Sequence, residues 1–172
     1  SKGIIEINDL LTRIDNSSNI TDIQVLFGDL APIGINTPIG LYISADSKNS
    51  KMNTVYAGQS GLNLPDRDYY LNDNPKFQDI RSSYKNHINK MMEMAGDSSS
   101  PGQAILDLET AIAQISWSRL ERRDPNKRYN KKNLIDWDNS LSIIDVQSIL
   151  TNRGFGAFDT IIVSQPSFFE SL

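Results

Sequence analysis

Ser100-Pro101-Gly102-Gln103 opens the stretch that decides the fold class, and the stretch continues as Ala104-Ile105-Leu106-Asp107-Leu108-Glu109-Thr110-Ala111-Ile112-Ala113-Gln114-Ile115. The opening residues match a capping box with proline at the first helical position, which is a typical helix start. The apolar residues that follow at steps of three and four, the spacing of one helix face, are Ile105, Leu108, Ile112 and Ile115. This pattern predicts a helix that runs to about Asp124-Pro125.

Further helices are predicted before this stretch. Asn74-Pro75 is a helix start with asparagine as the N-cap, and apolar residues recur on one face as far as Ala95. Gly96 is suited to end that helix. Nearer the N-terminus, apolar residues at helical spacing predict two short amphipathic helices over residues 4–14 and 20–30.

Three shorter elements are predicted after it. Asp145 can cap a short helix that ends at Gly154, and the β-branched run Thr160–Val163 is typical of a strand. Pro166 opens a further helix that includes Leu172. Because that pattern stops after barely two turns, it suggests a fragment of a longer protein.

A β-hairpin is predicted between the early helices and the central ones. Hydrophobic and polar residues alternate over residues 41–45 and again over 54–57, with the polar run Ser47–Lys51 between them. The fold class is therefore mainly α, a helical domain with a small β-hairpin at about 40–58 and a short strand near 160–164. With no internal repeat or low-complexity linker, residues 1–172 are predicted to belong to a single domain.

Composition excludes several classes of protein but does not identify the class to which this chain belongs. The chain has 172 residues, 38% of them hydrophobic, and a net charge of −4, so the chain as a whole resembles neither a nucleic-acid binder nor a membrane protein. It contains no apolar run of membrane-spanning length. The absence of cysteine excludes disulfides and thiolate chemistry but leaves the compartment unknown.

The sequence lacks the residues that familiar catalytic sites need. A zinc site usually has three protein ligands, and this chain has a single histidine, His87, which lies beside an apolar helix stripe and is interpreted as structural. Gly58-Gln59-Ser60-Gly61-Leu62 lacks the last glycine of a nucleophile elbow and is interpreted as a turn. Acid pairs that could act as acid and base are interpreted as solvated charge: Asp66 with Asp68, and Glu109 with Glu121.

One segment has an uneven charge. Residues Arg119 to Lys132, called here the basic segment, contain seven basic and two acidic residues, a net charge of +5. Three interpretations stay open: a solvated face, a contact with an acidic surface on the same or another domain, and a phosphate contact. Tyr129 is the only aromatic residue in it, which disfavours nucleic acid.

Four strings, taken together, resemble the neprilysin and endothelin-converting-enzyme family. The longest is Gly61-Leu62-Asn63-Leu64-Pro65-Asp66-Arg67-Asp68-Tyr69-Tyr70-Leu71, which is similar to the family's G-L-G-L-P-x-R-D-Y-Y segment. Pro38–Tyr42 with Asp46–Asn49 resembles the family's hairpin. Leu108–Ala113, leading to Arg123-Asp124-Pro125 and Tyr129-Asn130, resembles its central helix and following loop, and Val163–Phe169 resembles the strand and helix after it. The strings occur in family order from about Pro38 onward.

The resemblance implies a part of a zinc metalloendopeptidase that hydrolyses small peptides. The parent enzyme would bind zinc, and this chain would belong to its helical N-terminal domain, which limits access to the active-site cavity. The family's H-E-x-x-H, E-x-x-x-D and N-A-x-Y motifs have no counterpart here, so the catalytic domain is absent from this chain. No catalytic, metal-binding or substrate-binding residue can be assigned, and this chain alone is predicted to be inactive.

The implied partners are the parent enzyme's own catalytic domain and its peptide substrates, without nucleic acid and without a membrane segment in this chain. Candidate interdomain contacts are Arg122, Arg123, Asp124, Tyr129 and Asn130. The lack of cysteine departs from the family's disulfide-linked animal members and favours a bacterial enzyme. By the resemblance, such an enzyme would be exported, periplasmic or tethered to a membrane. The alternative is a freestanding helical interaction module whose basic segment docks a partner.

Overall fold

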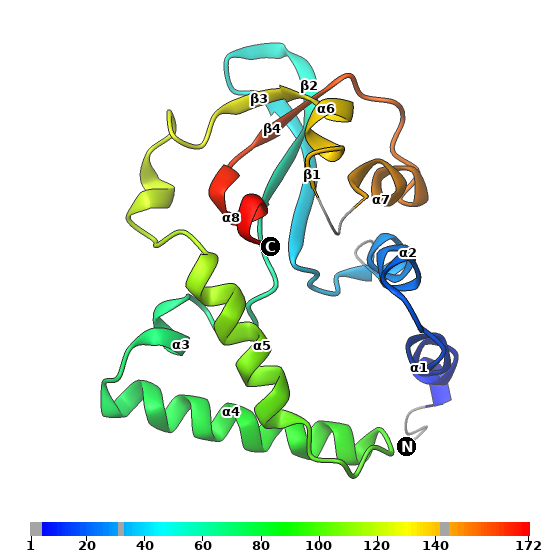
Figure 1. Cartoon of the computed structure of the whole chain (residues 1–172), viewed down its shortest axis with the longest axis vertical. Coiled ribbons are helices and arrows are strands. Elements are labelled where there is room, and N and C mark those ends of the chain that lie inside the picture. The colour runs from blue at the N-terminus through cyan, green and yellow to red at the C-terminus, as the bar shows by residue number, and fades with distance from the viewer. Residues whose placement is uncertain (1–4, 31–32, 142–144) are drawn as a thin grey trace. The chain divides into compact units, whose positions relative to one another are not determined.

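The computed structural model describes residues 5–30, 33–141 and 145–172, and the chain forms two compact units. Unit 1 comprises Ser1–Ser17 and Leu62–Gln114, and unit 2 comprises Ser18–Gly61 and Ile115–Leu172. The predicted fold class is confirmed, because the described chain is mainly helical with one small sheet (Figure 1). Ile4, which begins the first predicted helix, lies outside the described residues. That residues 1–172 belong to one helical domain stays a prediction.

Three helices of unit 1 were predicted and one, α3 (Asp68–Leu71), was not. The elements of unit 1 are the 3-10 turn η1 (Ile5–Ile7), α1 (Asn8–Asp15), α3, α4 (Pro75–Met94) and α5 (Gly102–Ile115). Asn74 caps α4 as predicted, since its side-chain oxygen accepts a hydrogen bond of 3.0 Å from the backbone N–H of Lys76. The helix ends before Gly96, whose φ of +97° ends the helical conformation.

Helix α5 begins one residue later than a capping box at Ser100 would place it. Ser100 has a φ of +57°, and the backbone N–H of Gly102 donates instead to the side-chain oxygen of Asn89 on α4, at 2.7 Å. A Cβ at Gly102 would lie 2.5 Å from the carbonyl oxygen of Lys85. The close approach of α5 to α4 therefore requires glycine at this position.

The prediction that this helix extends to about Asp124-Pro125 is wrong, because α5 ends at Ile115. The side-chain amide of Gln59 binds both backbone groups of Trp117: its oxygen accepts from the N–H at 2.7 Å, and its nitrogen donates to the carbonyl at 3.1 Å. The backbone of Trp117 is thus paired outside the helical ladder. The cause is a glutamine 58 residues away in sequence, which local periodicity cannot reveal.

Glu109 lies inside unit 1 and joins its elements. Its side chain is only 4% exposed, so the interpretation of this residue as solvated charge is wrong. The carboxylate accepts hydrogen bonds from the hydroxyl of Tyr70 at 2.6 Å, the hydroxyl of Tyr84 at 2.9 Å and the amide of Asn63 at 2.6 Å. These donors come from α3, α4 and the loop before α3, so one carboxylate on α5 connects three other segments.

The pKa values of both tyrosines report this environment. Burial, followed by the hydrogen bond to Glu109, raises the pKa of Tyr70, and the same two causes raise the pKa of Tyr84 to about 12. The Tyr70 hydroxyl also accepts a hydrogen bond of 2.8 Å from the backbone N–H of Leu64. Tyr70 therefore ties the loop before α3 to α5 as a neutral phenol at every pH near neutrality.

Unit 2 contains a four-stranded sheet in the order β1-β2-β4-β3 (Figure 1). The hairpin of β1 (Ile39–Asp46) and β2 (Asn49–Gln59) confirms the predicted hairpin, and β4 (Thr160–Val163) confirms the predicted strand. Strand β4 pairs with β2 in parallel, Tyr56 opposite Ile162, and with β3 (Asn130–Asn133) antiparallel. Strand β3 was not predicted, since its polar sequence has no hydrophobic alternation.

Helices pack around this sheet and complete the core of unit 2. They are α2 (Ile20–Leu30), α6 (Leu134–Asp138), α7 (Val146–Asn152) and α8 (Pro166–Ser171), with the 3-10 turn η3 (Glu121–Arg123). Asp145 caps α7 and Pro166 opens α8, as predicted. The fully buried side chains of the core are Val55, Ala57, Val146, Ile161, Ile162, Val163 and Phe168. The ring of Phe169 contacts Trp137 edge-on, with centroids 5.2 Å apart.

The Glu109 cluster generates a prediction for stability. Replacing Tyr70 by Phe removes one donor to a buried carboxylate and is expected to lower the free energy of unfolding by about 1–3 kcal/mol. The adjacent Tyr69→Phe serves as a matched control and should change it by less than about 0.5 kcal/mol. Urea denaturation of the three proteins measures both values. Equal effects of the two substitutions would contradict the role of Glu109.

Candidate functional site

The basic segment is an ordered loop followed by an edge strand. After α5 the chain forms the turn η3, then a turn around Asp124, and then enters the sheet as β3. Glu121 accepts hydrogen bonds from the backbone N–H and the hydroxyl of Ser118, both at 2.7 Å. Asp124 accepts from the backbone N–H of Asn126 at 2.9 Å. Both acidic side chains of the segment thus fix the loop that carries the arginines and lysines.

Asn130 fastens the end of this loop to the sheet. Its side-chain nitrogen donates to the backbone carbonyls of Lys127 at 2.7 Å and Val163 at 3.0 Å. Its backbone lies opposite Val163 in the β3–β4 ladder. The position of the loop is therefore determined by β4, the central buried strand.

A buried carboxylate holds the same end of the segment. Asp46, at the end of β1, is only 1% exposed and forms an ion pair with the ammonium group of Lys131 at 2.9 Å. The hydroxyl of Tyr129 donates to the same carboxylate at 3.0 Å, and so does the backbone N–H of Lys48 at 2.9 Å. The ammonium of Lys48 lies 4.2 Å from the centroid of the Tyr129 ring, a cation–π contact.

The pKa values agree with this geometry. The hydrogen bond from Lys131, followed by that from the backbone of Lys48, lowers the pKa of Asp46 to about 2. The hydrogen bond to Asp46 raises the pKa of Lys131. Burial, followed by the hydrogen bond to Asp46, raises the pKa of Tyr129. The pair Asp46–Lys131 is thus charged across the whole neutral range.

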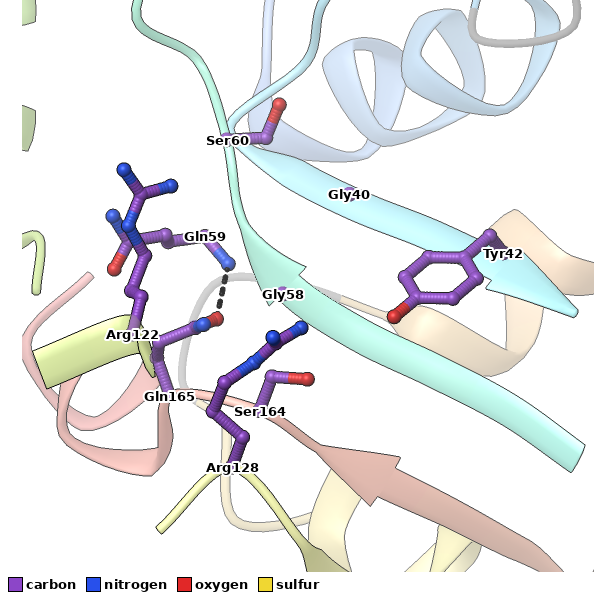
Figure 2. A pocket seen from close by; sticks show the side chains of 9 residues that line it. All are labelled: Gly40, Tyr42, Gly58, Gln59, Ser60, Arg122, Arg128, Ser164 and Gln165. Carbon is purple, nitrogen blue, oxygen red and sulfur yellow. Dashed lines mark hydrogen bonds between the residues drawn. The ribbon is translucent and has the colours of Figure 1, made fainter. Parts of the chain in front are cut away.

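Unit 2 also contains a pocket of about 250 Å³, and Arg128, the residue before Tyr129, is part of its lining (Figure 2). Its lining combines two arginines, three hydroxyl side chains, two glutamines and two glycines, with no acidic residue among them: Gly40, Tyr42, Gly58, Gln59, Ser60, Arg122, Arg128, Ser164 and Gln165. Figure 2 shows the guanidinium of Arg128 and the hydroxyls of Ser164 and Tyr42 directed toward the same space beside Gly58. The pocket is therefore polar and electropositive.

Two glycines leave the floor of the pocket without side chains. Gly40 and Gly58 lie directly opposite each other in the β1–β2 ladder. A Cβ at Gly58 would lie 3.3 Å from the side-chain oxygen of Gln165, which is already accepting a hydrogen bond of 2.9 Å from the backbone N–H of Gln59. The side-chain amide of Gln59 is itself bonded to Trp117. The polar wall around the glycines is thus held in place by its own hydrogen bonds.

The structure gives the five predicted contact residues different environments. Arg122 lines the pocket and Arg123 is exposed to solvent. Asp124, Tyr129 and Asn130 are partly buried and bind the loop, Asp46 and the sheet respectively. That these residues contact another domain stays a prediction.

Sequence reasoning missed the residues that complete the site. Asp46 and Lys131 are 85 residues apart, and the pocket brings Gly40 and Tyr42 to Arg128. The only local signal was the cross-strand position of Gly40 and Gly58 in the predicted hairpin. The remaining partners depend on β3 pairing with β4, which no sequence pattern indicated.

The other candidate residues do not gather into a catalytic arrangement. His87 is exposed on α4, and Glu109 is bound by two tyrosines and an asparagine. Over residues 5–30, 33–141 and 145–172, no three or more histidine, cysteine, aspartate or glutamate side chains form a group able to hold a metal ion. None of the described helices combines the length and the apolar character that a membrane crossing requires.

Comparisons with known proteins place this architecture among metallopeptidases. The N-terminal model described as peptidase family M13 matches residues 1–172. Endothelin-converting enzyme 1 of Rattus norvegicus is 43% identical over 96 residues, which cover 53% of this chain and 12% of that protein. Neprilysin-11 of Caenorhabditis elegans is 31% identical over 124 residues, covering 65% of this chain and 14% of that protein.

A solved structure has the same fold. The zinc metalloprotease Zmp1 of Mycobacterium tuberculosis, in complex with an inhibitor, superposes with a TM-score of 0.88 at 28% sequence identity. The match covers 98% of this chain and 26% of Zmp1. The chain thus spans about a quarter of that structure.

The Asp46–Lys131 pair generates a prediction for pH dependence. The lowered pKa of Asp46 means that the pair stabilises the fold above the unfolded pKa of about 3.9 and loses this contribution as the pH falls toward about 2. Lys131→Met should therefore be less stable than the wild type at pH 7, with a difference that shrinks below about pH 4. Urea denaturation across this pH range measures the difference.

Lys132→Met is the matched control, because Lys132 is the exposed neighbour on the same strand. It should show little difference from the wild type at either pH. A Lys131→Met difference that is the same at pH 7 and pH 2 would rule out Asp46 as its source.

Proposed function

The chain belongs to peptidase family M13, and on that premise we propose that it is part of a zinc metallopeptidase that hydrolyses small peptides. The observation that carries the proposal is the family match over all of residues 1–172 in a sequence that contains one histidine and no H-E-x-x-H motif. The chain corresponds to 26% of the length of Zmp1, a zinc metalloprotease. The zinc ligands and the catalytic glutamate of the parent would then lie outside this chain.

Within that enzyme, this chain is a non-catalytic part that limits access to the active-site cavity. Its ordered secondary structure and buried carboxylate networks suit a wall more than a reactive centre, because the carboxylates of Glu109 and Asp46 both accept structural hydrogen bonds. A cavity closed by rigid walls admits short peptides and excludes folded proteins. No observation favours the freestanding interaction module.

The basic segment contacts the catalytic domain of the same enzyme. Its loop is held in one conformation by Glu121, Asp124 and Asn130, so Arg123 is presented at a defined place and exposed. Ordered charge of one sign on a protein surface favours an interface of opposite sign. A solvated, mobile loop would not need these internal hydrogen bonds.

Zinc content and peptide hydrolysis test whether the catalytic site lies outside this chain. The purified chain of residues 1–172 is expected to bind no stoichiometric zinc and to cleave no peptide. The protein expressed from the full reading frame should contain zinc and lose its activity on chelation. Metal-dependent turnover by the 172-residue chain, or a reading frame without H-E-x-x-H, would contradict the proposal.

Chemical labelling tests the interdomain contact. Phenylglyoxal should modify Arg123 several-fold more slowly in the full-length protein than in the 172-residue chain, because an interface excludes the reagent. Arg13, exposed on α1 and outside the basic segment, is the internal reference. Mass spectrometry quantifies both sites. Equal labelling of Arg123 in the two proteins would contradict the proposed interdomain contact.

A further inference from the structure

We propose that the pocket beside Arg128 is a carboxylate-binding site, and that its occupant is an acidic side chain from the part of the same protein outside residues 1–172. The inference rests on the proposed function, because it assumes that such a part packs against unit 2. The proposed function places the basic segment in contact with another domain, and this inference adds a binding site for one acidic side chain of that domain. The pocket and its residues all belong to unit 2, so the inference uses one compact unit only.

Arg128 supplies the main donor. Its guanidinium makes no hydrogen bond or ion pair with any residue that the structure describes, although it lines the pocket and lies next to Tyr129, which is bound to Asp46. Guanidinium groups present paired N–H donors in a plane that matches the two oxygens of a carboxylate. A charged donor without a counter-ion at the mouth of a built pocket indicates an anionic ligand.

Neutral donors surround the same space. The hydroxyls of Ser164 and Tyr42 are directed into it beside Arg128 (Figure 2). Ser164 is only 3% exposed, and its backbone N–H is held by the carbonyl of Ala57 at 2.8 Å, so its position does not depend on a ligand. Hydroxyl donors next to a guanidinium can bind the remaining lone pairs of a carboxylate.

No acidic group of the segment competes for this position. Asp46 is bound by Lys131, Tyr129 and the backbone of Lys48. Glu121 and Asp124 accept backbone hydrogen bonds of their own loop. Because none of the nine lining residues is acidic, no carboxylate in the pocket wall neutralises the guanidinium of Arg128.

The shape of the pocket admits a side chain and not only water. Its volume of about 250 Å³ is well above the space that one water molecule needs. The cross-strand pair Gly40 and Gly58 leaves the floor open, and the hydrogen bond between Gln59 and Gln165 keeps the wall from closing over it. An aspartate or glutamate side chain can therefore enter and reach Arg128.

Hydrogen exchange of the full-length protein tests the occupant. Arg128→Met is expected to raise the exchange rate of the backbone at residues 57–61 and 163–165 by about ten-fold, since it removes the charged partner of the proposed carboxylate. Lys127→Met is the matched control: Lys127 is the exposed neighbour and does not line the pocket. Its exchange should stay within about two-fold of the wild type.

A folding control and two contradicting outcomes complete the test. Exchange at α2, a helix of unit 2 that contributes no residue to the pocket lining, should be unchanged in Arg128→Met, which establishes that this variant is folded. If Arg128→Met behaves like Lys127→Met, the carboxylate site is refuted even where Arg123 is protected from phenylglyoxal. If the wild type shows protection only after inorganic phosphate is added, the pocket takes a free anion, and the intramolecular carboxylate is likewise refuted.

Discussion

The pairing of strand β4 on both of its edges is the constraint on which unit 2 depends. Ile161, Ile162 and Val163 are fully buried, and they align with β2 on one side and β3 on the other. The parallel partner lies more than a hundred residues earlier in the chain, so this pairing closes a long loop and determines where the hairpin meets the basic segment. The Asp46 network and the pocket both follow from that alignment.

Buried carboxylates then connect the strings that resemble the family. Glu109, in the string of the central helix, binds Asn63 and Tyr70 of the longest string. Asp46, in the hairpin string, binds Tyr129 of the loop string. Both carboxylates are buried and accept hydrogen bonds from tyrosine hydroxyls. Removing one such donor from a buried carboxylate lowers the free energy of unfolding. The resemblance to the neprilysin and endothelin-converting-enzyme family, confirmed by the family match, thus rests on residues with a structural task.

The same kind of hydrogen bond orders the basic segment. Its acidic residues and Asn130 bind its own backbone. The segment carries exposed basic residues on a hydrogen-bonded loop and an edge strand, next to a pocket without acidic lining. That it attaches this chain to another part of the protein stays a proposal. Bacterial origin and an exported location stay predictions.

The sequence by itself determined the elements that depend on neighbours in the chain. The caps at Asn74 and Asp145, the proline at the start of α8, the hairpin and β4 all follow from local patterns, because capping, proline geometry and side-chain alternation act over a few residues. The absence of the H-E-x-x-H motif is likewise established by the sequence alone.

Only the tertiary structure decided the end of α5, the burial of Glu109, the strand β3 and the pocket at Arg128. Each depends on a partner far away in sequence: Gln59 for Trp117, Tyr70 for Glu109, and β4 for the polar residues of β3. A polar side chain has the same local pattern whether it is solvated or buried. What distinguishes the two is the hydrogen-bond partner that folding brings to it, and no local pattern contains that partner.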